Sequence, residues 1–130
     1  MVEKKFYKCN ICGNLFGVIN DSGVTPQCCG QDMVELKANS TDAAQEKHVP
    51  VIERDGNKVT VKIGSVPHPM LEEHYIMWVL VTNPSGTTER HEFKPGDKPE
   101  AVFFIHEDEG PITAYEYCNL HGLWVATEDK

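Results

Sequence analysis

The chain has 130 residues, which is room for one ordinary domain or for a very small domain joined to a compact one. Its net charge of −8 argues against a nucleic-acid partner, because phosphate recognition needs clustered Lys and Arg. No stretch approaches the roughly 20 apolar residues of a membrane span, and the first residues lack the apolar core of a signal peptide, so we expect a cytoplasmic protein with no membrane partner.

Cysteine and histidine divide the sequence into two parts. Residues 1–37 hold four of the five cysteines, whereas the rest holds all six histidines and both tryptophans. Residues 38–45 between them are small and polar, which is typical of a linker. We therefore predict one domain over 1–37 and a second over 38–130. An odd number of cysteines in a reducing compartment favours metal binding over disulfides.

The first part contains two cysteine pairs. Cys9 and Cys12 are separated by two residues, and Cys28 and Cys29 are adjacent. Four thiolates grouped in this way suit a tetrahedral zinc or iron site, and their spacing does not distinguish the two metals, so a structural zinc knuckle remains an alternative. A segment of this length has too small a core to fold by apolar burial, so a metal would supply most of its stability.

The second part alternates short extended runs with turn signals. The Asp55-Gly56 step, for example, is a strong hairpin signal between two runs of alternating apolar residues. No helical period is evident. Seven strands are predicted, over 49–54, 58–63, 75–82, 87–93, 101–106, 112–118 and 123–127. This pattern predicts a mainly β protein in which the small metal knuckle precedes an immunoglobulin-like antiparallel β-sandwich.

Four histidines surround the fifth cysteine in the predicted sandwich. Cys118 and His121 lie three residues apart, so a thiolate and an imidazole can reach one metal ion from a single turn. A single histidine is more often a surface or core residue than a ligand, but the group is hard to explain by packing. We predict a second metal site with the ligands His48, His68, His74, Cys118 and His121. His91 and His106 lie among acidic and other charged residues and are left out.

These motifs resemble a known family. The first part resembles desulforedoxin, in which a Cys-x-x-Cys pair and a Cys-Cys pair bind one iron. The whole chain resembles the desulfoferrodoxins and neelaredoxins, through Glu46-Lys47-His48-Val49-Pro50, His68-Pro69-Met70, Glu73-His74-Tyr75 and Cys118-Asn119-Leu120-His121-Gly122. The resemblance implies a superoxide reductase with two iron ions per chain, which reduces superoxide to hydrogen peroxide and protects an anaerobic or microaerophilic cell from oxidative stress.

The resemblance also assigns roles to individual residues. The first iron would be held by Cys9, Cys12, Cys28 and Cys29. The second would have four imidazoles, from His48, His68, His74 and His121, and one thiolate, from Cys118. Lys47 would supply local positive charge for the anionic substrate, and Glu46 would close the sixth position of the ferric resting state. The family further implies a homodimer and a rubredoxin-like electron donor.

Three alternatives remain open on the sequence. A non-catalytic iron electron carrier would have a filled second site. A zinc-stabilised binding module would be colourless, and a superoxide dismutase would also have to oxidise superoxide. Glu116 lies two residues before Cys118, where strand alternation places both on one side, so a hydrogen bond that tunes the sulfur and a solvent-facing position are both compatible with the sequence.

Overall fold

A computed structural model of the chain describes residues 4–39, 48–64 and 69–128. Contacts divide the chain into two compact units, residues 1–37 and 38–130, which are treated separately below. The only helix in the described ranges is a single 3-10 turn, η1 (Glu107–Glu109), so none of these residues forms a helix long and apolar enough to cross a membrane.

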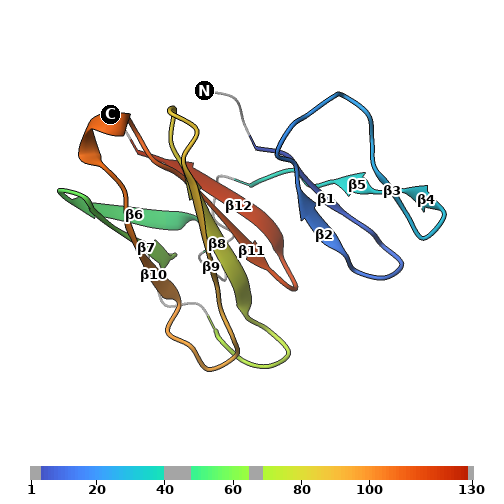
Figure 1. Cartoon of the computed structure of the whole chain (residues 1–130). Coiled ribbons are helices and arrows are strands. Elements are labelled where there is room, and N and C mark those ends of the chain that lie inside the picture. Colours follow the sequence, from blue (N-terminus) through green and yellow to red (C-terminus); the bar gives the residue numbers. More distant parts are fainter. Residues whose placement is uncertain (1–3, 40–47, 65–68, 129–130) are drawn as a thin grey trace. The chain divides into compact units, whose positions relative to one another are not determined.

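The first unit consists of very short strands joined by turns (Figure 1). They are β1 (Phe6–Lys8), β2 (Leu15–Gly17), β3 (Gln27–Cys28), β4 (Gln31–Asp32) and β5 (Val34–Glu35). β1 pairs with β2 and β5 in one antiparallel sheet, and β3 and β4 form a separate hairpin. Four of the described apolar residues of this unit are buried, Phe6, Tyr7, Cys9 and Met33, and the last three form one cluster, so a cysteine belongs to a very small core.

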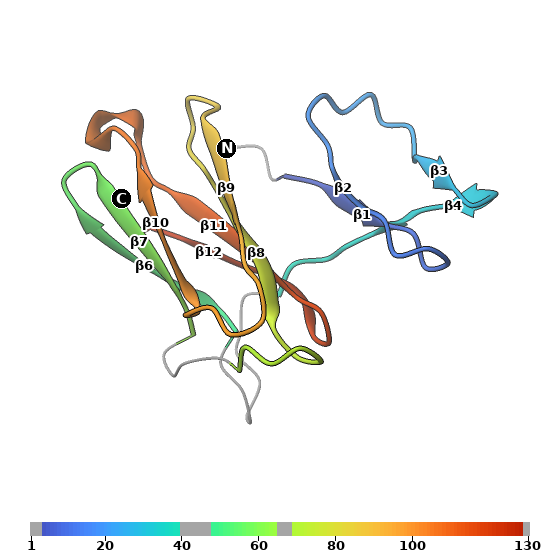
Figure 2. The ribbon, with the colours of Figure 1, turned by 60° about the horizontal axis from the view of Figure 1, so that its bottom comes forward.

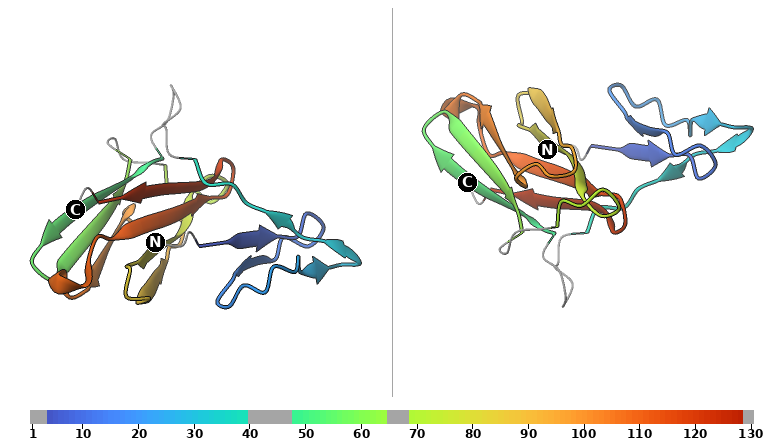
Figure 3. Two further views of the ribbon diagram at one scale, coloured as in Figure 1. Left: turned by 90° about the horizontal axis from the view of Figure 1, so that it is seen from above. Right: turned by 90° about the horizontal axis from the view of Figure 1, so that it is seen from below.

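The second unit is a sandwich of two antiparallel sheets, which confirms the predicted mainly β fold (Figures 1 and 2). One sheet has the order β10-β7-β6 and the other β12-β11-β8-β9. The strands are β6 (Pro50–Asp55), β7 (Lys58–Ile63), β8 (Ile76–Thr82), β9 (Thr88–Glu92), β10 (Glu100–Phe104), β11 (Thr113–Cys118) and β12 (Gly122–Thr127). The two layers can be followed from above and below in Figure 3.

Alternating side chains build the core between the layers. Val59, Val61 and Ile63 of β7 are buried, and they pack with Val79 and Val81 of the opposite sheet. The β6–β7 hairpin turns at Gly56, whose φ of 61° lies in the left-handed region that glycine adopts without strain. Thirteen buried residues form this continuous core. The sandwich therefore buries apolar side chains from both of its sheets, as the sequence pattern predicts.

An ion pair joins three strands at one end of the sandwich. Arg54, at the end of β6, donates from Nε and Nη2 to the two carboxylate oxygens of Glu128, at 3.1 and 2.8 Å. Glu128 Oε1 also accepts the backbone N–H of Ile112, just before β11, at 2.8 Å. The two charged side chains are only 6% and 9% exposed. This end is opposite the one where β6 and β12 begin.

One part of the predicted linker joins the sandwich. Asn39 donates its N–H to Leu123 O and accepts the N–H of Val125, both at 2.9 Å, in a parallel bridge to β12. β12 is an edge strand, and an edge strand presents backbone groups that need partners. Asn39 supplies two of them, which the polar composition of this segment did not reveal. Residues 40–45 of the predicted linker lie outside the described residues.

Candidate metal centres

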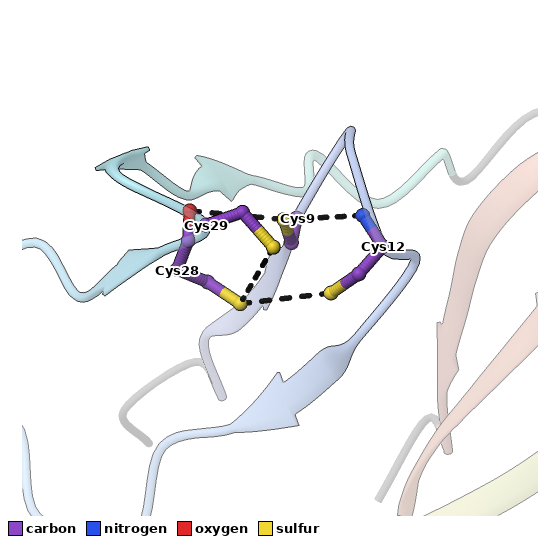
Figure 4. Close-up of side chains that lie close together, drawn as sticks. All are labelled: Cys9, Cys12, Cys28 and Cys29. Carbon is purple, nitrogen blue, oxygen red and sulfur yellow. Dashed lines mark hydrogen bonds between the residues drawn. The ribbon is translucent and has the colours of Figure 1, made fainter.

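Two turns bring the four cysteines of the first unit together (Figure 4). After β1 the chain reverses, with Gly13 N–H donating to Cys9 O at 2.9 Å, so that Cys9 and Cys12 lie on one turn. On the facing hairpin, Cys28 ends β3 and Cys29 begins the turn to β4. The four sulfur atoms are all within 4.8 Å of one another, and all four cysteines are free thiols.

The backbone at Cys29 explains how adjacent cysteines reach one point. Side chains of neighbouring residues in a strand point to opposite faces. Cys29 has a φ of 54° and Gly30 a φ of 78°, so two consecutive residues take the left-handed conformation. Cys29 is the only residue other than glycine with positive φ in the described part of the chain. The conformation turns its thiol back beside that of Cys28.

The sulfur spacing fits a tetrahedral metal. A tetrahedron with metal–sulfur bonds of about 2.3 Å has sulfur atoms about 3.8 Å apart. The Cys12 and Cys28 sulfur atoms are separated by 3.6 Å, and those of Cys28 and Cys29 by 3.9 Å. The donor set and its geometry therefore fit a tetrahedral sulfur site, as the spacing of the cysteines predicts.

The cysteines of this cluster have pKa values that are shifted in opposite directions. Backbone N–H groups of Cys12 and Ile11 lower the pKa of Cys9 to about 6 by stabilising its thiolate. Hydrogen bonding with the neighbouring thiols, Cys12 first, raises the pKa of Cys29 to about 12 and also raises that of Cys28. A metal must displace the protons of Cys28 and Cys29 to bind at neutral pH, so metal affinity at this site depends on pH.

The second cluster forms where several strands of the sandwich begin or end. His48 precedes β6, His74 precedes β8, Cys118 ends β11, and His121 lies in the turn before β12. One ligand atom from each residue lies within 4.8 Å of the others. His48 and Cys118 are fully buried, His74 is half-buried and His121 is exposed. The cluster therefore has a buried side and a side that faces solvent.

Trp124 on β12 packs against this cluster. Its indole ring stacks on His48, with centroids 4.7 Å apart and planes at 12°, and its Nε1 donates to His121 O at 3.2 Å. The His121 ring meets those of His48 and His74 edge to face, at centroid distances of 4.9 and 5.1 Å. One tryptophan thus contacts two of the four clustered residues, the ring of His48 and the backbone of His121.

Glu116 is buried in the core and does not face solvent. It is 0% exposed, and its Cα partners across the sheet are Val79 and Trp124, which places it on the inner face with Cys118. A carboxylate is very seldom buried to this extent. The structure therefore removes the solvent-facing alternative and keeps Glu116 on the side of the sheet where Cys118 lies.

The remaining predicted residues fall into two groups. His68, Glu46 and Lys47 lie outside the described residues. His91 on β9 and His106 before η1 are both exposed and belong to neither cluster, in line with their exclusion. Trp124 contacts His48 and His121, and Asn119 bonds to Glu73 and Tyr75 on either side of His74; neither was predicted. Asn119 had a signal in its position between Cys118 and His121, but the role of Trp124 depends on strand pairing.

Both clusters fit a transition metal by their donor chemistry. Four thiols suit zinc or iron, and three imidazole nitrogens with one thiol suit a borderline metal such as iron, copper or zinc. Each set converges on a small volume, and part of each is exposed to solvent. The described residues thus contain two groups able to hold a metal, one in each unit.

Comparison with known proteins identifies the family. The profile described as Desulfoferrodoxin matches residues 40–127, and that of the Desulfoferrodoxin N-terminal domain matches residues 2–36. The chain belongs to the desulfoferrodoxin family. A desulfoferrodoxin homolog from Archaeoglobus fulgidus is 50% identical over 118 residues, which cover 91% of this chain and 92% of the relative.

Two further family comparisons involve superoxide reductases. A protein of that name from Pyrococcus horikoshii is 42% identical over 71% of this chain and 94% of its own length. The crystal structure of the superoxide reductase from Treponema pallidum superimposes with a TM-score of 0.78 at 34% identity, covering 95% of this chain and 97% of that one. Both matches agree with the resemblance seen in the sequence motifs.

Proposed function

We propose that this desulfoferrodoxin is an iron-dependent superoxide reductase, which combines superoxide, one electron and two protons into hydrogen peroxide. The observation that carries the proposal is the convergence of His48, His74, Cys118 and His121 at one end of the sandwich. Relatives and solved structures named superoxide reductase support the same activity. A ferrous ion held by these ligands would supply the electron to superoxide.

The predicted fourth imidazole, His68, completes the proposed ligand set. Nitrogen and sulfur ligands together suit a redox-active iron, and a protein shell that leaves one position open distinguishes a catalytic from a structural metal site. The exposure of His121 supports access of a small substrate from solvent.

Burial of Cys118 suits a site that makes peroxide. Oxidation of a cysteine by peroxide follows the exposure and the thiolate character of the sulfur. Cys118 is 0% exposed and belongs to the apolar core, whereas the solvent side of the cluster is formed by an imidazole. The protein thereby keeps solvent and product away from the sulfur while a ligand that peroxide attacks less readily faces outward.

The domain that the anionic substrate must approach is itself acidic. Residues 38–130 hold eight Lys and Arg against sixteen Asp and Glu, whereas residues 1–37 hold four of each, so the second unit carries the whole charge of −8. An acidic surface repels an anion at long range. We propose that Lys47 supplies the local positive charge at the site and that Glu46 closes the ferric resting state.

The first site is proposed to hold iron as well, giving two iron ions per chain. It would act as an electron-transfer or structural centre, with reducing equivalents from a rubredoxin-like donor. The protein is proposed to be a cytoplasmic homodimer, with the domain of residues 1–37 carrying the first iron and that of 38–130 the catalytic iron. The family membership is the support for these assignments.

Stopped-flow absorption tests the activity. Chemically reduced protein of known metal content is mixed with a superoxide pulse, and peroxide is measured. One peroxide per oxidised second iron is expected. Cys118→Ser and His74→Ala should abolish the reaction, and Lys47→Ala should slow it by about tenfold or more. His91→Ala is the matched control, because His91 is exposed on β9, and it should react as the unchanged protein does.

Three outcomes would contradict the reductase. Iron at both sites without any reaction with superoxide would assign the chain to the electron carriers. Zinc at both sites and a colourless protein would assign it to the binding modules. Release of one oxygen molecule for each hydrogen peroxide formed would indicate a dismutase.

A further inference from the structure

Asn119 connects the turn of Cys118 and His121 to the segment that carries His74. Its backbone N–H donates to Tyr75 O at 3.2 Å, and its Oδ1 accepts the N–H of Tyr75 at 3.0 Å. Its Nδ2 donates to Glu73 O at 3.1 Å. The residues on both sides of His74 are thus hydrogen-bonded to a single asparagine, which is the immediate neighbour of Cys118.

The regular strand pairing does not reach His74 by itself. Along the β8–β11 pair, Tyr117 is opposite Trp78, but Cys118 is opposite Ile76, so the register shifts between these two positions. The ladder of β8 begins at Ile76, two residues after His74. Beyond this bulge, Asn119 supplies the bonds that a regular ladder would have made. An asparagine can do so because its short side chain carries both a donor and an acceptor.

The segment before His74 is held at its start, where Met70 packs against the core and accepts the N–H of Gly96 at 2.7 Å, but the residues between Met70 and His74 have few further contacts. Leu71, Glu72 and Glu73 are exposed, and a local pair of backbone bonds joins Leu71 to His74 at 2.9 and 3.1 Å. A segment with few buried contacts opens easily. Local bonds fix the shape of the turn, but only a bond to another element fixes its distance from Cys118 and His121. Asn119 makes that bond twice through its side chain.

We propose that Asn119 is a positioning residue, which holds His74 at ligand distance from Cys118 and His121. The inference rests on the proposed function, since it concerns the same metal centre. Groups that orient metal ligands without touching the metal typically change its affinity by about 10- to 100-fold when removed. Asn119 is therefore expected to matter more for metal binding than for the stability of the sandwich.

Asn83 provides a matched control. Its Oδ1 accepts the N–H of Thr87 at 3.0 Å and the hydroxyl of Ser85 at 2.8 Å, and its Nδ2 donates to Glu109 at 3.0 Å. Asn83 follows the last residue of β8, whereas His74 lies before the first. Asn83 therefore makes the same kinds of side-chain hydrogen bond as Asn119, but at the other end of that strand. Asn83 is also the more buried of the two, so its loss should cost at least as much stability.

The experiment is a titration of the metal-free, full-length chain with Co²⁺ in competition with a chelator. The all-sulfur first site and the mixed second site have different cobalt absorption bands, so each affinity is measured separately. Asn119→Ala should weaken Co²⁺ binding at the second site by about 10- to 100-fold and shift its bands. Binding at the first site should not change. Asn83→Ala should lower the Tm of the sandwich but leave both cobalt affinities within about twofold.

A second variant covers the case in which Asn119→Ala unfolds. Asn119→Asp keeps the volume and the oxygen that accepts from Tyr75, but it replaces the donor to Glu73 O. The added negative charge by itself would strengthen Co²⁺ binding. A weaker Co²⁺ affinity in Asn119→Asp would therefore be due to the loss of the hydrogen bond to Glu73 O.

The outcomes separate the inference from the function on which it rests. Unchanged cobalt affinity in Asn119→Ala, or equal losses in the two asparagine variants, would overturn the positioning role. If the unchanged protein bound no Co²⁺ at the second site, the proposed metal centre itself would fail.

Discussion

The two metal clusters differ in how much of the surrounding fold depends on them. In the described part of the first unit, one of the four buried core residues is Cys9, a proposed metal ligand. In the sandwich, thirteen residues form the core, and Cys118 is the single clustered residue among them. The first cluster is thus part of the core that folds its unit, whereas the second is attached to a sandwich that has a core of its own. Metal should therefore be needed for folding in one unit and for chemistry in the other.

Removal of metal gives the largest expected effect. A chelator should unfold residues 4–37, because structural metal sites in small domains contribute about 10–16 kcal/mol to folding. The sandwich should keep a cooperative thermal transition, since its core contains few ligands. Amide hydrogen exchange, measured on the metal-loaded and metal-free chain, resolves the two units. Protection of residues 4–37 that persists without metal would break the comparison.

The Arg54–Glu128 pair tests whether the sandwich is stabilised by contacts that do not involve a metal. Arg54→Ala leaves a buried carboxylate without its cation, which should lower the free energy of unfolding of the sandwich by about 3–5 kcal/mol. Metal affinity at the second site should stay the same, because the pair lies at the other end of β6 from His48. Chemical denaturation followed by tryptophan fluorescence measures the change, since both tryptophans are in the sandwich.

Arg90→Ala is the control for that change. Arg90 and Glu92 form an exposed pair at 3.6 Å on β9, and such pairs contribute about 0–1 kcal/mol. Equal losses in the two variants would show that the buried pair has no special part in the stability of the sandwich.

The pH dependence of metal affinity should also differ between the two clusters, and this is a smaller effect than those above. The pKa of Cys29 is about 12 and that of Cys28 is raised, so both are protonated at pH 7 and must lose protons to bind metal. Affinity at the first site should rise with pH by about 10-fold per unit for each displaced proton, and so by at least about 100-fold per unit between pH 7 and 8. Below about pH 6 the slope should steepen as Cys9, with a pKa of about 6, also becomes protonated.

Metal-buffered titrations at several pH values provide the measurement. The second site contains a single thiol, so its affinity should rise less steeply over the same range. If metal affinity rose equally steeply with pH at the two sites, the protons of the Cys28 and Cys29 thiols would not control metal binding in the first unit.

The sandwich was predictable because its sequence signals are local. Alternation along Lys58–Ile63 and the Asp55-Gly56 turn determine strands that the structure places within one residue of the prediction. The five strands of the first unit were not predicted, because runs of two or three residues show no period. The cysteine pairs still located the metal cluster there, since their spacing needs no strand assignment.

Contacts that depend on pairing between distant strands were not predictable. Alternation placed Glu116 on the side of Cys118, but only the sheet shows that this side is the core. Trp124 reaches His48 through strands whose order the sequence does not specify. Asn119 acts beyond a bulge in the β8–β11 pair, and no local pattern marks where that bulge falls.

The order of the ligands along the chain also sets an order in time. His121 follows Cys29 by 92 residues, and a ribosome adds about 5 to 20 residues each second. The four thiols of the first unit are therefore synthesised about 5 to 20 seconds before the last ligand of the second cluster. A nascent chain can acquire its first metal while the sandwich is still incomplete, whereas the catalytic centre can be loaded only after the β11–β12 turn has been made.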